Sequence, residues 1–175
     1  GSKVKPGDVV LGLASSGPHS NGFSLIRKIV EVSGASWDMP FDGATLADRL
    51  MEPTRIYCKQ VANVMKKVPI HAMAHITGGG LVENVPRVLP EGTQVVIHRD
   101  SWKRPAIFDW LQKEGNVAED EMLRVFNNGI GLVVIVPAEA ADAAVSAFES
   151  EGEKVYRLGE VVNRANAADP GCVVI

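Results

Sequence analysis

The chain has 175 residues, of which 46% are hydrophobic and 22% are charged, a composition typical of one globular domain with its own core. The formal net charge is −3 and both signs are scattered, which excludes a basic nucleic-acid tail and a basic membrane patch. No apolar run reaches the roughly 18 residues that a membrane span needs, and no signal peptide is visible.

Cysteine usage indicates the compartment. The chain has two cysteines, Cys58 and Cys172, and they fit no zinc or C-x-x-C spacing. Two isolated thiols in a chain of this length favour a reducing compartment, so we expect a cytoplasmic protein. Each thiol is expected to act as a small apolar side chain.

The first half of the chain is expected to contain a strand and three helices. Residues 1–2 resemble the remnant of a cleaved tag, and a strand over 9–13 follows almost at once. We therefore expect 3–175 to be one domain whose preceding domain is absent from this chain. The remaining expectations in this half are a helix over 22–32, a loop over 33–43, a helix over 45–51 capped by Thr45, and a helix over 54–67.

The second half alternates strands with helices. A helix is expected to begin in the glycines 78–80, and Pro86 must kink or end its first piece. The other expected elements are strands over 71–76, 93–98, 129–136, 154–162 and 172–175, and helices over 105–115, over 118–126 and from Pro137. This alternation predicts a layered α/β domain.

The first loop that can carry chemistry is SSGPHSNG, residues 15–22, between a strand and a helix. Unpaired N–H groups at a helix N-terminus attract anions, and Ser20 and Asn21 add side-chain donors. His19 adds a group that can donate, accept or carry charge near neutral pH. Capping of the helix by Ser20 or Asn21 is the alternative, but it does not account for the histidine and the glycines.

The second loop, HITGGG, residues 75–80, also joins a strand to a helix. Its three glycines let the backbone approach a ligand closely, although a flexible connection is the alternative. The G-x-G-x-x-G pattern fails because Glu83 stands at the third glycine position, and no P-loop Gly-Lys-Ser/Thr follows. The esterase pattern G-x-S-x-G fails because Leu13 occupies the first glycine position.

Other polar residues have competing interpretations. His71 and His75 would be about 13 Å apart on a strand, too far to share zinc, so we expect no metal site and a structural role for His71. Arg55 can clamp a phosphate or carboxylate or form a surface ion pair. Asn127 is a natural turn residue that can also present its amide to a substrate.

Four stretches resemble the aminoimidazole ribonucleotide synthetase family, also called phosphoribosylformylglycinamidine cyclo-ligases. They are GDVVLGLASSGPHSNGFSLIRKI, EPTRIY, AHITGGGLVENVPRVLP and RVFNNGIG, in the family's order between about residues 7 and 162. In that family these motifs belong to the C-terminal domain. The resemblance implies a three-layer α/β/α fold with a mixed sheet. It also implies an N-terminal domain, absent here, that supplies most of the ATP site and the main contact of a homodimer.

The resemblance implies the fifth step of de novo purine synthesis. ATP phosphorylates the formyl amide oxygen of formylglycinamidine ribonucleotide, the amidine-side nitrogen attacks the activated carbon, and phosphate leaves as the imidazole ring closes. Magnesium would neutralise the nucleotide phosphates. The domain alone is expected to be inactive, and neither nucleic acid nor membrane is an expected partner.

The matching residues receive roles from this resemblance. His19 and His75 are the candidate catalytic residues, and His19 would stabilise charge on the amide oxygen or move a proton. Phosphate and substrate binding is assigned to the two loops, with Arg55 and Asn127 beside them; the loop residues are Ser16, Gly17, Ser20, Asn21, Gly22, Thr77, Gly78, Gly79 and Gly80.

Two alternatives stay open. The chain can be a non-catalytic anion-binding or regulatory module, because no complete catalytic set is visible in the sequence. It can also be part of a sister enzyme such as formylglycinamidine ribonucleotide synthetase or selenophosphate synthetase.

Overall fold

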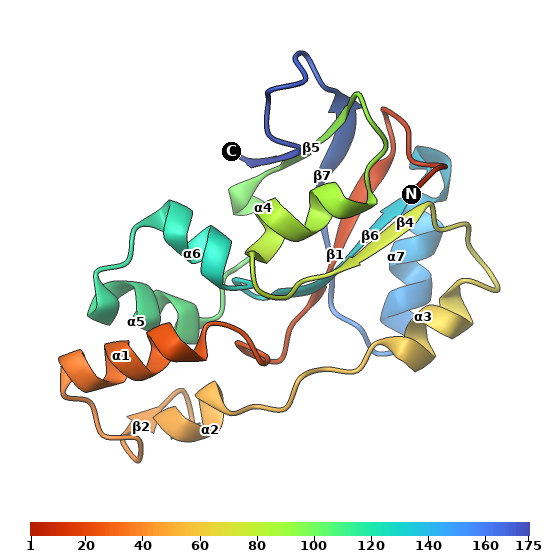
Figure 1. Cartoon of the computed structure of the whole chain (residues 1–175). Helices are drawn as coiled ribbons and strands as arrows, with labels where there is room; N and C mark the ends of the chain where they lie inside the picture. The colour runs from red at the N-terminus through yellow and green to blue at the C-terminus, as the bar shows by residue number, and fades with distance from the viewer.

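The structure is a computed structural model that describes residues 1–175, and it is built on a six-stranded mixed sheet (Figure 1). The strand order is β4-β6-β1-β7-β5-β8. The strands are β1 (Val9–Ala14), β4 (Ala72–His75), β5 (Thr93–Ile97), β6 (Ile130–Val136), β7 (Val155–Asn163) and β8 (Cys172–Val174).

The pairing directions place two strand ends together. β1 and β4 both pair antiparallel with β6, which lies between them, so β1 and β4 run in the same direction. Their carboxyl ends therefore lie at one edge of the sheet, next to the start of β6. β7 pairs antiparallel with β1, and only β5 and β8 pair in parallel.

Helices cover both faces of the sheet and form a separate group at one end (Figure 1). The helices are α1 (Phe23–Ser33), α2 (Leu46–Leu50), α3 (Cys58–Val64), α4 (Gly80–Asn84), α5 (Ala106–Gly115), α6 (Glu119–Val125) and α7 (Ala141–Ser150). A 3₁₀ turn over Val85–Val88 continues α4, and α1 ends at Gly34 in the left-handed conformation.

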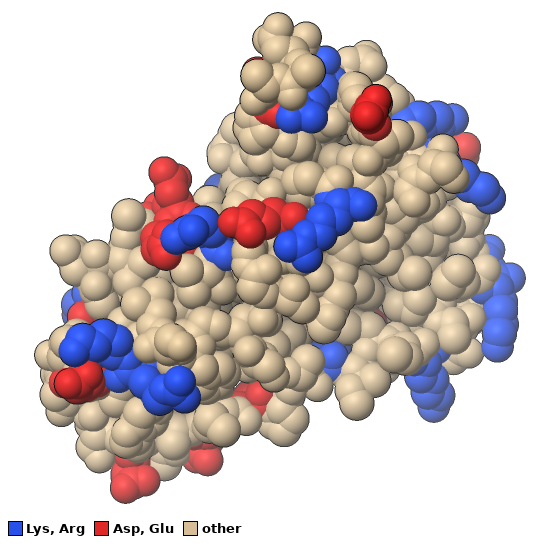
Figure 2. All heavy atoms as spheres, viewed as in Figure 1, with Lys and Arg blue, Asp and Glu red and all other residues tan.

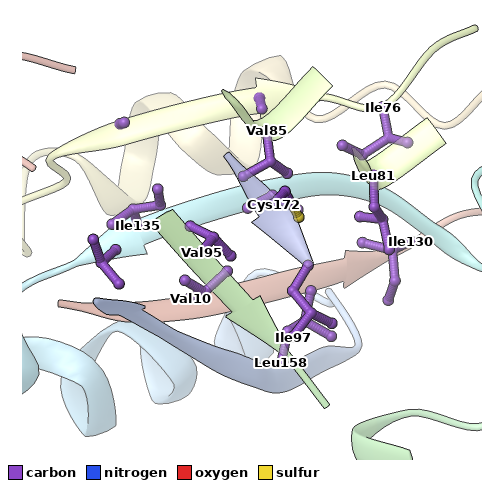
Figure 3. Close-up of a cluster of buried hydrophobic side chains, with 14 of the residues drawn as sticks. Val10, Ile76, Leu81, Val85, Val95, Ile97, Ile130, Ile135, Leu158 and Cys172 are labelled. Carbon is purple, nitrogen blue, oxygen red and sulfur yellow. The ribbon is translucent and has the colours of Figure 1, made fainter. Parts of the chain in front are cut away.

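Strand side chains alternate between two cores. On one face, strand residues pack with Leu81 of α4 and Val85, as Figure 3 shows, and Cys172 lies in the same layer. On the other face, strand residues pack with Val64 of α3 and Phe148 of α7. The expected three-layer α/β/α fold with a mixed sheet is confirmed.

The two cysteines lie in different surroundings. Burial raises the pKa of the Cys172 thiol to about 12, whereas Cys58 is exposed.

A third core holds α1, α2, α5 and α6 together beside the sheet. Ile26, Ile29 and Val30 of α1 are buried in it, which confirms the helical spacing of these residues. Because α1 is anchored here, its N-terminus is presented to the sheet edge where β1 ends.

Two expectations from the sequence are wrong. The helix expected over 54–67 spans only Cys58–Val64, because residues 51–57, here called the strap, form a segment without helix or strand that crosses from α2 to α3. Pro53 disfavours helix in the residue before it, and contacts described below hold the strap in place. The loop expected over 33–43 contains β2 (Pro40–Phe41), which pairs with β3 (Ala44–Thr45).

The hairpin turn between β2 and β3 is Asp42-Gly43, with φ values of 47° and 77°. Asp-Gly is a strong hairpin signal, so this hairpin was readable from the sequence.

The surface in Figure 2 carries charges of both signs, with acidic and basic side chains alternating in a row over α6 and α4. None of the helices combines the length and apolar character that a membrane crossing requires.

Candidate functional site

The two glycine-containing loops meet at one edge of the sheet. The first loop, residues 15–22, follows β1, and the second, residues 75–80, includes the end of β4 and leads into α4. The start of β6 lies between them: the Ser15 N–H donates to the Gly129 carbonyl at 2.9 Å, and the Ile76 N–H donates to the Gly131 carbonyl at 2.9 Å. The antiparallel pairing of β6 with both strands is what brings these loops together.

His19 lies at the centre of this edge and is only 4% exposed. Its φ of 56° is in the left-handed region, which turns the loop toward α1. The ring lies 6.5 Å from the ring of His75 and 6.5 Å from that of Tyr57, between ring centroids. The sheet thus brings together the two histidines that the sequence singled out, and adds a tyrosine.

Hydrogen bonding defines which nitrogen of His19 carries the proton. Nε2 accepts the Ser16 N–H at 3.1 Å and faces the Arg55 N–H at 3.5 Å, so Nδ1 carries the proton in the neutral ring. Nδ1 is buried and has no hydrogen-bond partner. Burial, with a smaller contribution from His75, lowers the pKa of His19 to about 4, so the ring is neutral at physiological pH.

Gly131 on β6 provides the space for this cluster. A Cβ at Gly131 would lie 2.0 Å from the Tyr57 hydroxyl oxygen and 2.7 Å from Cε1 of His19. The Tyr57 hydroxyl donates to the Ala14 carbonyl at 2.7 Å, and burial raises the pKa of this tyrosine. Tyr57 and Gly131 were not among the residues predicted from the sequence, although both lie in the stretches that carry the family resemblance.

The backbone of the first loop has free donors. The N–H groups of Gly17, His19, Ser20 and Gly22 have no acceptor within the protein. Gly22 precedes α1 at a φ of 74°, and no side chain caps this helix, so capping by Ser20 or Asn21 is not what the structure shows. Asn21 is half-buried, while the Ser20 hydroxyl lies 3.4 Å from that of Thr54.

The backbone of the second loop also has free donors. The N–H groups of Thr77, Gly78 and Gly79 have no acceptor within the protein. Gly79 and Gly80 have φ values of 98° and 57°, and a Cβ at Gly80 would lie 1.9 Å from the Leu123 carbonyl oxygen. Glycine is therefore required where this loop packs on the end of α6.

Two hollows open beside the loops. The inter-loop hollow, about 290 Å³, lies between Gly22 of the first loop and Gly78 and Gly79 of the second, with Glu83 and Arg124 at its sides. The strap hollow, about 320 Å³, lies between α1 and the strap. Its polar lining comprises His19, Ser20, Arg27, Glu52 and Thr54.

Arg55 is held by a buried carboxylate. Its Nε donates to Glu153 at 2.8 Å and a terminal nitrogen donates to the Gly152 carbonyl at 3.1 Å. The Glu153 side chain is fully buried, while that of Arg55 is 38% exposed, and this contact raises the pKa of Arg55. In this structure the guanidinium links the strap to the residues directly before β7. Arg55, which the sequence analysis considered as a phosphate or carboxylate clamp or as a surface ion pair, is therefore paired with a carboxylate of the protein itself.

The strap is fixed at a second point as well, because the Ser16 hydroxyl donates to the Pro53 carbonyl at 2.6 Å. On its other side the strap borders a mostly apolar hollow of about 500 Å³, which His75 and Tyr57 also line. Ile56 of the strap is 75% exposed beside it.

Asn127 is fully buried directly before β6. Its Oδ1 accepts the Ser15 hydroxyl at 3.0 Å and the Gly129 N–H at 2.8 Å, and its Nδ2 donates to the Gly17 carbonyl at 2.9 Å. The Asn127 amide therefore bonds to the buried side of the first loop.

Away from this edge of the sheet, the ring of His71 pairs with the buried carboxylate of Asp8 at 2.7 Å, in line with the structural role expected for His71.

The sequence family described as AIR synthase related protein, C-terminal domain, matches residues 5–168. The chain belongs to this family. It is 53% identical over 174 residues to the phosphoribosylformylglycinamidine cyclo-ligase of Cupriavidus pinatubonensis, covering 99% of this chain and 50% of that protein. It is 55% identical over 165 residues to the enzyme of the same name from Cupriavidus taiwanensis, covering 94% of this chain and 47% of that protein. The chain spans about half the length of the curated relatives it matches.

Solved structures share the fold of this AIR synthase related domain. A hydrogenase maturation protein HypE matches with a TM-score of 0.65 and 19% identity, over 98% of this chain and 50% of its own. Thiamine-monophosphate kinase from Stenotrophomonas maltophilia matches with a TM-score of 0.66 and 16% identity, over 98% of this chain and 51% of its own. HypE in complex with ATP matches with a TM-score of 0.65 and 22% identity, over 98% of this chain and 48% of its own. At these identities the likeness shows the fold alone.

Proposed function

We propose that this chain is the C-terminal, substrate-side domain of a phosphoribosylformylglycinamidine cyclo-ligase. The whole enzyme would convert formylglycinamidine ribonucleotide to aminoimidazole ribonucleotide with ATP. The observation that carries the proposal is the meeting of two loops with free N–H groups around a buried neutral histidine, in a chain whose relatives bear this name. Those names favour the cyclo-ligase over the sister enzymes.

The free N–H groups of both loops suit a phosphate. Backbone donors with no internal acceptor, placed before helices, stabilise an anion without a bound cation. In this proposal the free N–H groups of Gly17, Ser20 and Gly22 bind the substrate phosphate, with the Asn21 side chain as a further donor. Ser16 positions the loop instead, because its N–H and hydroxyl donate to His19 and to the Pro53 carbonyl. Thr77, Gly78, Gly79 and Gly80 face the ATP phosphates or the reacting amide across the inter-loop hollow.

The chemistry assigned to His19 follows from its protonation state. A neutral imidazole whose Nδ1–H lacks a partner is a hydrogen-bond donor, and because Nδ1 is buried, this proposal requires the ring to turn toward the loops before it donates to charge developing on the amide oxygen. It is poorly suited to act as a general base near pH 7, because its basic nitrogen, Nε2, already accepts a backbone N–H. His75, exposed at the end of β4, remains the second candidate catalytic group.

The roles of Arg55 and Asn127 change in this proposal. Arg55 positions the strap through Glu153, and Asn127 positions the first loop, because both side chains bond within the protein. ATP phosphates call for Mg²⁺, but no three His, Cys, Asp or Glu side chains converge in this chain. We assign Mg²⁺ and most of the ATP site to an N-terminal domain outside this chain, with the full-length enzyme a cytoplasmic homodimer.

Replacing His19 by Ala in the full-length enzyme tests the proposal. We expect kcat for ATP-dependent ring closure to fall by about 100-fold or more, because a stabilising donor is lost from the site. His98→Ala is the matched control, since His98 is exposed and outside the site. Normal turnover in His19→Ala would instead favour a non-catalytic anion-binding module.

A further inference from the structure

The strap hollow contains two charged side chains that the contacts described above leave unpaired. The hollow has a volume of about 320 Å³ and lies between α1 and the strap. Arg27 of α1 belongs to one wall and Glu52 of the strap to the other. Both residues are exposed, and neither side chain forms an ion pair or a hydrogen bond within the protein.

The charged neighbours of these two residues are engaged elsewhere. On α1, Lys28 pairs with Glu31 at 3.0 Å. On the strap, Arg55 pairs with the buried carboxylate of Glu153 at 2.8 Å. The two unpaired side chains are therefore the charges that a molecule entering the strap hollow would meet.

The position of Arg27 on α1 favours an anion. Arg27 follows Phe23 by about one helical turn, and both residues line the strap hollow. Side chains of a helix lean toward its N-terminus, so the guanidinium is carried toward Ser20 and Gly22, whose N–H groups have no acceptor within the protein. A positive side chain, free N–H groups and the positive end of the helix together favour a phosphate group.

Glu52 provides the opposite charge on the facing wall. It comes directly before Pro53, whose carbonyl accepts the Ser16 hydroxyl at 2.6 Å, and that contact holds this part of the strap in place. A carboxylate can accept two parallel N–H groups, as it does from the planar guanidinium of arginine. An amidinium presents the same planar pair of N–H groups and carries a positive charge. Glu52 is therefore suited to an amidinium and not to a phosphate.

His19 supplies an independent observation that points to a ligand in this hollow. The residue is 4% exposed and forms part of the wall, yet its Nδ1 has no hydrogen-bond partner. A buried polar group without a partner is an exception in folded proteins. A polar ligand in the strap hollow, toward which the ring turns, would supply the missing acceptor.

We propose that Arg27 and Glu52 are substrate-binding residues that bind the two charged groups of formylglycinamidine ribonucleotide in the strap hollow. Arg27 binds the phosphate, and Glu52 binds the amidinium. This inference rests on the proposed function, because that function supplies a substrate with one phosphate and one strongly basic amidine. The volume of the hollow lies within the range of about 300–1,000 Å³ that is usual for small-molecule sites.

The pair of opposite charges has a consequence for selectivity. The analogue with an amide in place of the amidine has the same phosphate but no positive charge, and its carbonyl oxygen would face the Glu52 carboxylate. Two acceptors that face each other lack a donor and repel. Glu52 should therefore favour the amidine over the amide, whereas Arg27 should bind both molecules through the phosphate.

Steady-state kinetics of the full-length enzyme test both residues. Glu52→Gln and Arg27→Met should each raise KM for formylglycinamidine ribonucleotide by about tenfold or more, because a charged hydrogen-bond partner is lost. KM for ATP should stay unchanged. The amide analogue, used as a competitive inhibitor, is the second probe. Arg27→Met should raise its Ki by about tenfold or more, while Glu52→Gln should leave its Ki unchanged or lower it.

Lys28→Met and Glu31→Gln are the matched controls, because they remove the same two charges from exposed positions of α1 that do not line the strap hollow. They should leave KM and Ki unchanged. Arg27→Lys keeps the charge but not the planar pair of N–H groups, so its KM and Ki should lie between those of the unsubstituted enzyme and of Arg27→Met. Thermal unfolding reports whether each variant is folded.

The outcomes separate this inference from the proposed function. If the folded variants keep the KM of the unsubstituted enzyme and its preference for the amidine, the inference is wrong while the proposed function stands. If Glu52→Gln weakens binding of the amidine and the amide equally, Glu52 does not recognise the amidine, and the inference is again wrong. If the unsubstituted full-length enzyme gives no ATP-dependent ring closure, the proposed function itself is wrong, and this inference falls with it.

Discussion

At the scale of single residues, burial of His19 makes the stability of the fold depend on pH in the mildly acidic range. The pKa of His19 is lowered from 6.5 to about 4, so between these values the unfolded chain binds a proton that the folded chain does not. The free energy of unfolding contributed by His19 is therefore fully present above about pH 6.5 and is lost as the pH falls toward 4. The full effect is of the order of 3 kcal/mol.

Urea unfolding at pH 7, 6, 5 and 4.5 measures this contribution. His19→Gln removes the titrating group, so its stability should fall less steeply over this range than that of the unsubstituted chain. His98→Gln, at an exposed position, should keep the original slope. Parallel curves for His19→Gln and the unsubstituted chain would contradict the buried neutral state of His19.

At the scale of elements, strand β6, which lies between β4 and β1, supports the site through the absence of a side chain at Gly131. Gly131→Ala should displace Tyr57 and His19, because the added methyl would lie 2.0 Å from the Tyr57 hydroxyl oxygen. Overpacking of this kind costs about 1–3 kcal/mol of stability. We expect kcat of the full-length enzyme to fall by about tenfold or more in addition to this loss of stability.

Gly12→Ala on the neighbouring strand β1 is the matched control. Its added methyl would lie 2.7 Å from Cδ1 of Leu158, the end of a flexible side chain away from the loops. Thermal unfolding and kinetics of the two variants should show two losses of stability but only one loss of turnover. Equal turnover in both variants would mean that the position of the Tyr57–His19 cluster does not matter for catalysis.

At the scale of the whole molecule, the proposed function implies that the site is incomplete within this chain. The chain spans about half of its curated relatives, and the strap presents Ile56 and Met51 to solvent at 75% and 66% exposure. We expect the 175-residue chain alone to give no ATP-dependent ring closure. Mixing it with the separately produced N-terminal half should restore product formation, and product formed by this chain alone would refute the expectation.

Much of the fold was readable from the sequence. The strands at 9–14 and 130–136, and the helix at 23–33, follow from apolar runs and helical spacing, which depend on local burial patterns. Both loops were also recognisable, because glycine, serine and histidine cluster between a strand and a helix in each. The strap was not predicted, because tertiary contacts at both Arg55 and Ser16 override the local helical tendency of residues 54–57.

The sequence by itself determined the family and the chemical inventory of the site, because the motifs are local and keep their order along the chain. Only the tertiary structure decided that β6 separates β1 from β4, so that the two loops meet. It also decided the hydrogen-bond partners of Arg55 and Asn127, whose polar groups bond to Glu153 and to the first loop. The physical reason is that strand pairing, burial and hydrogen-bond partners join residues far apart in the chain, which local patterns do not encode.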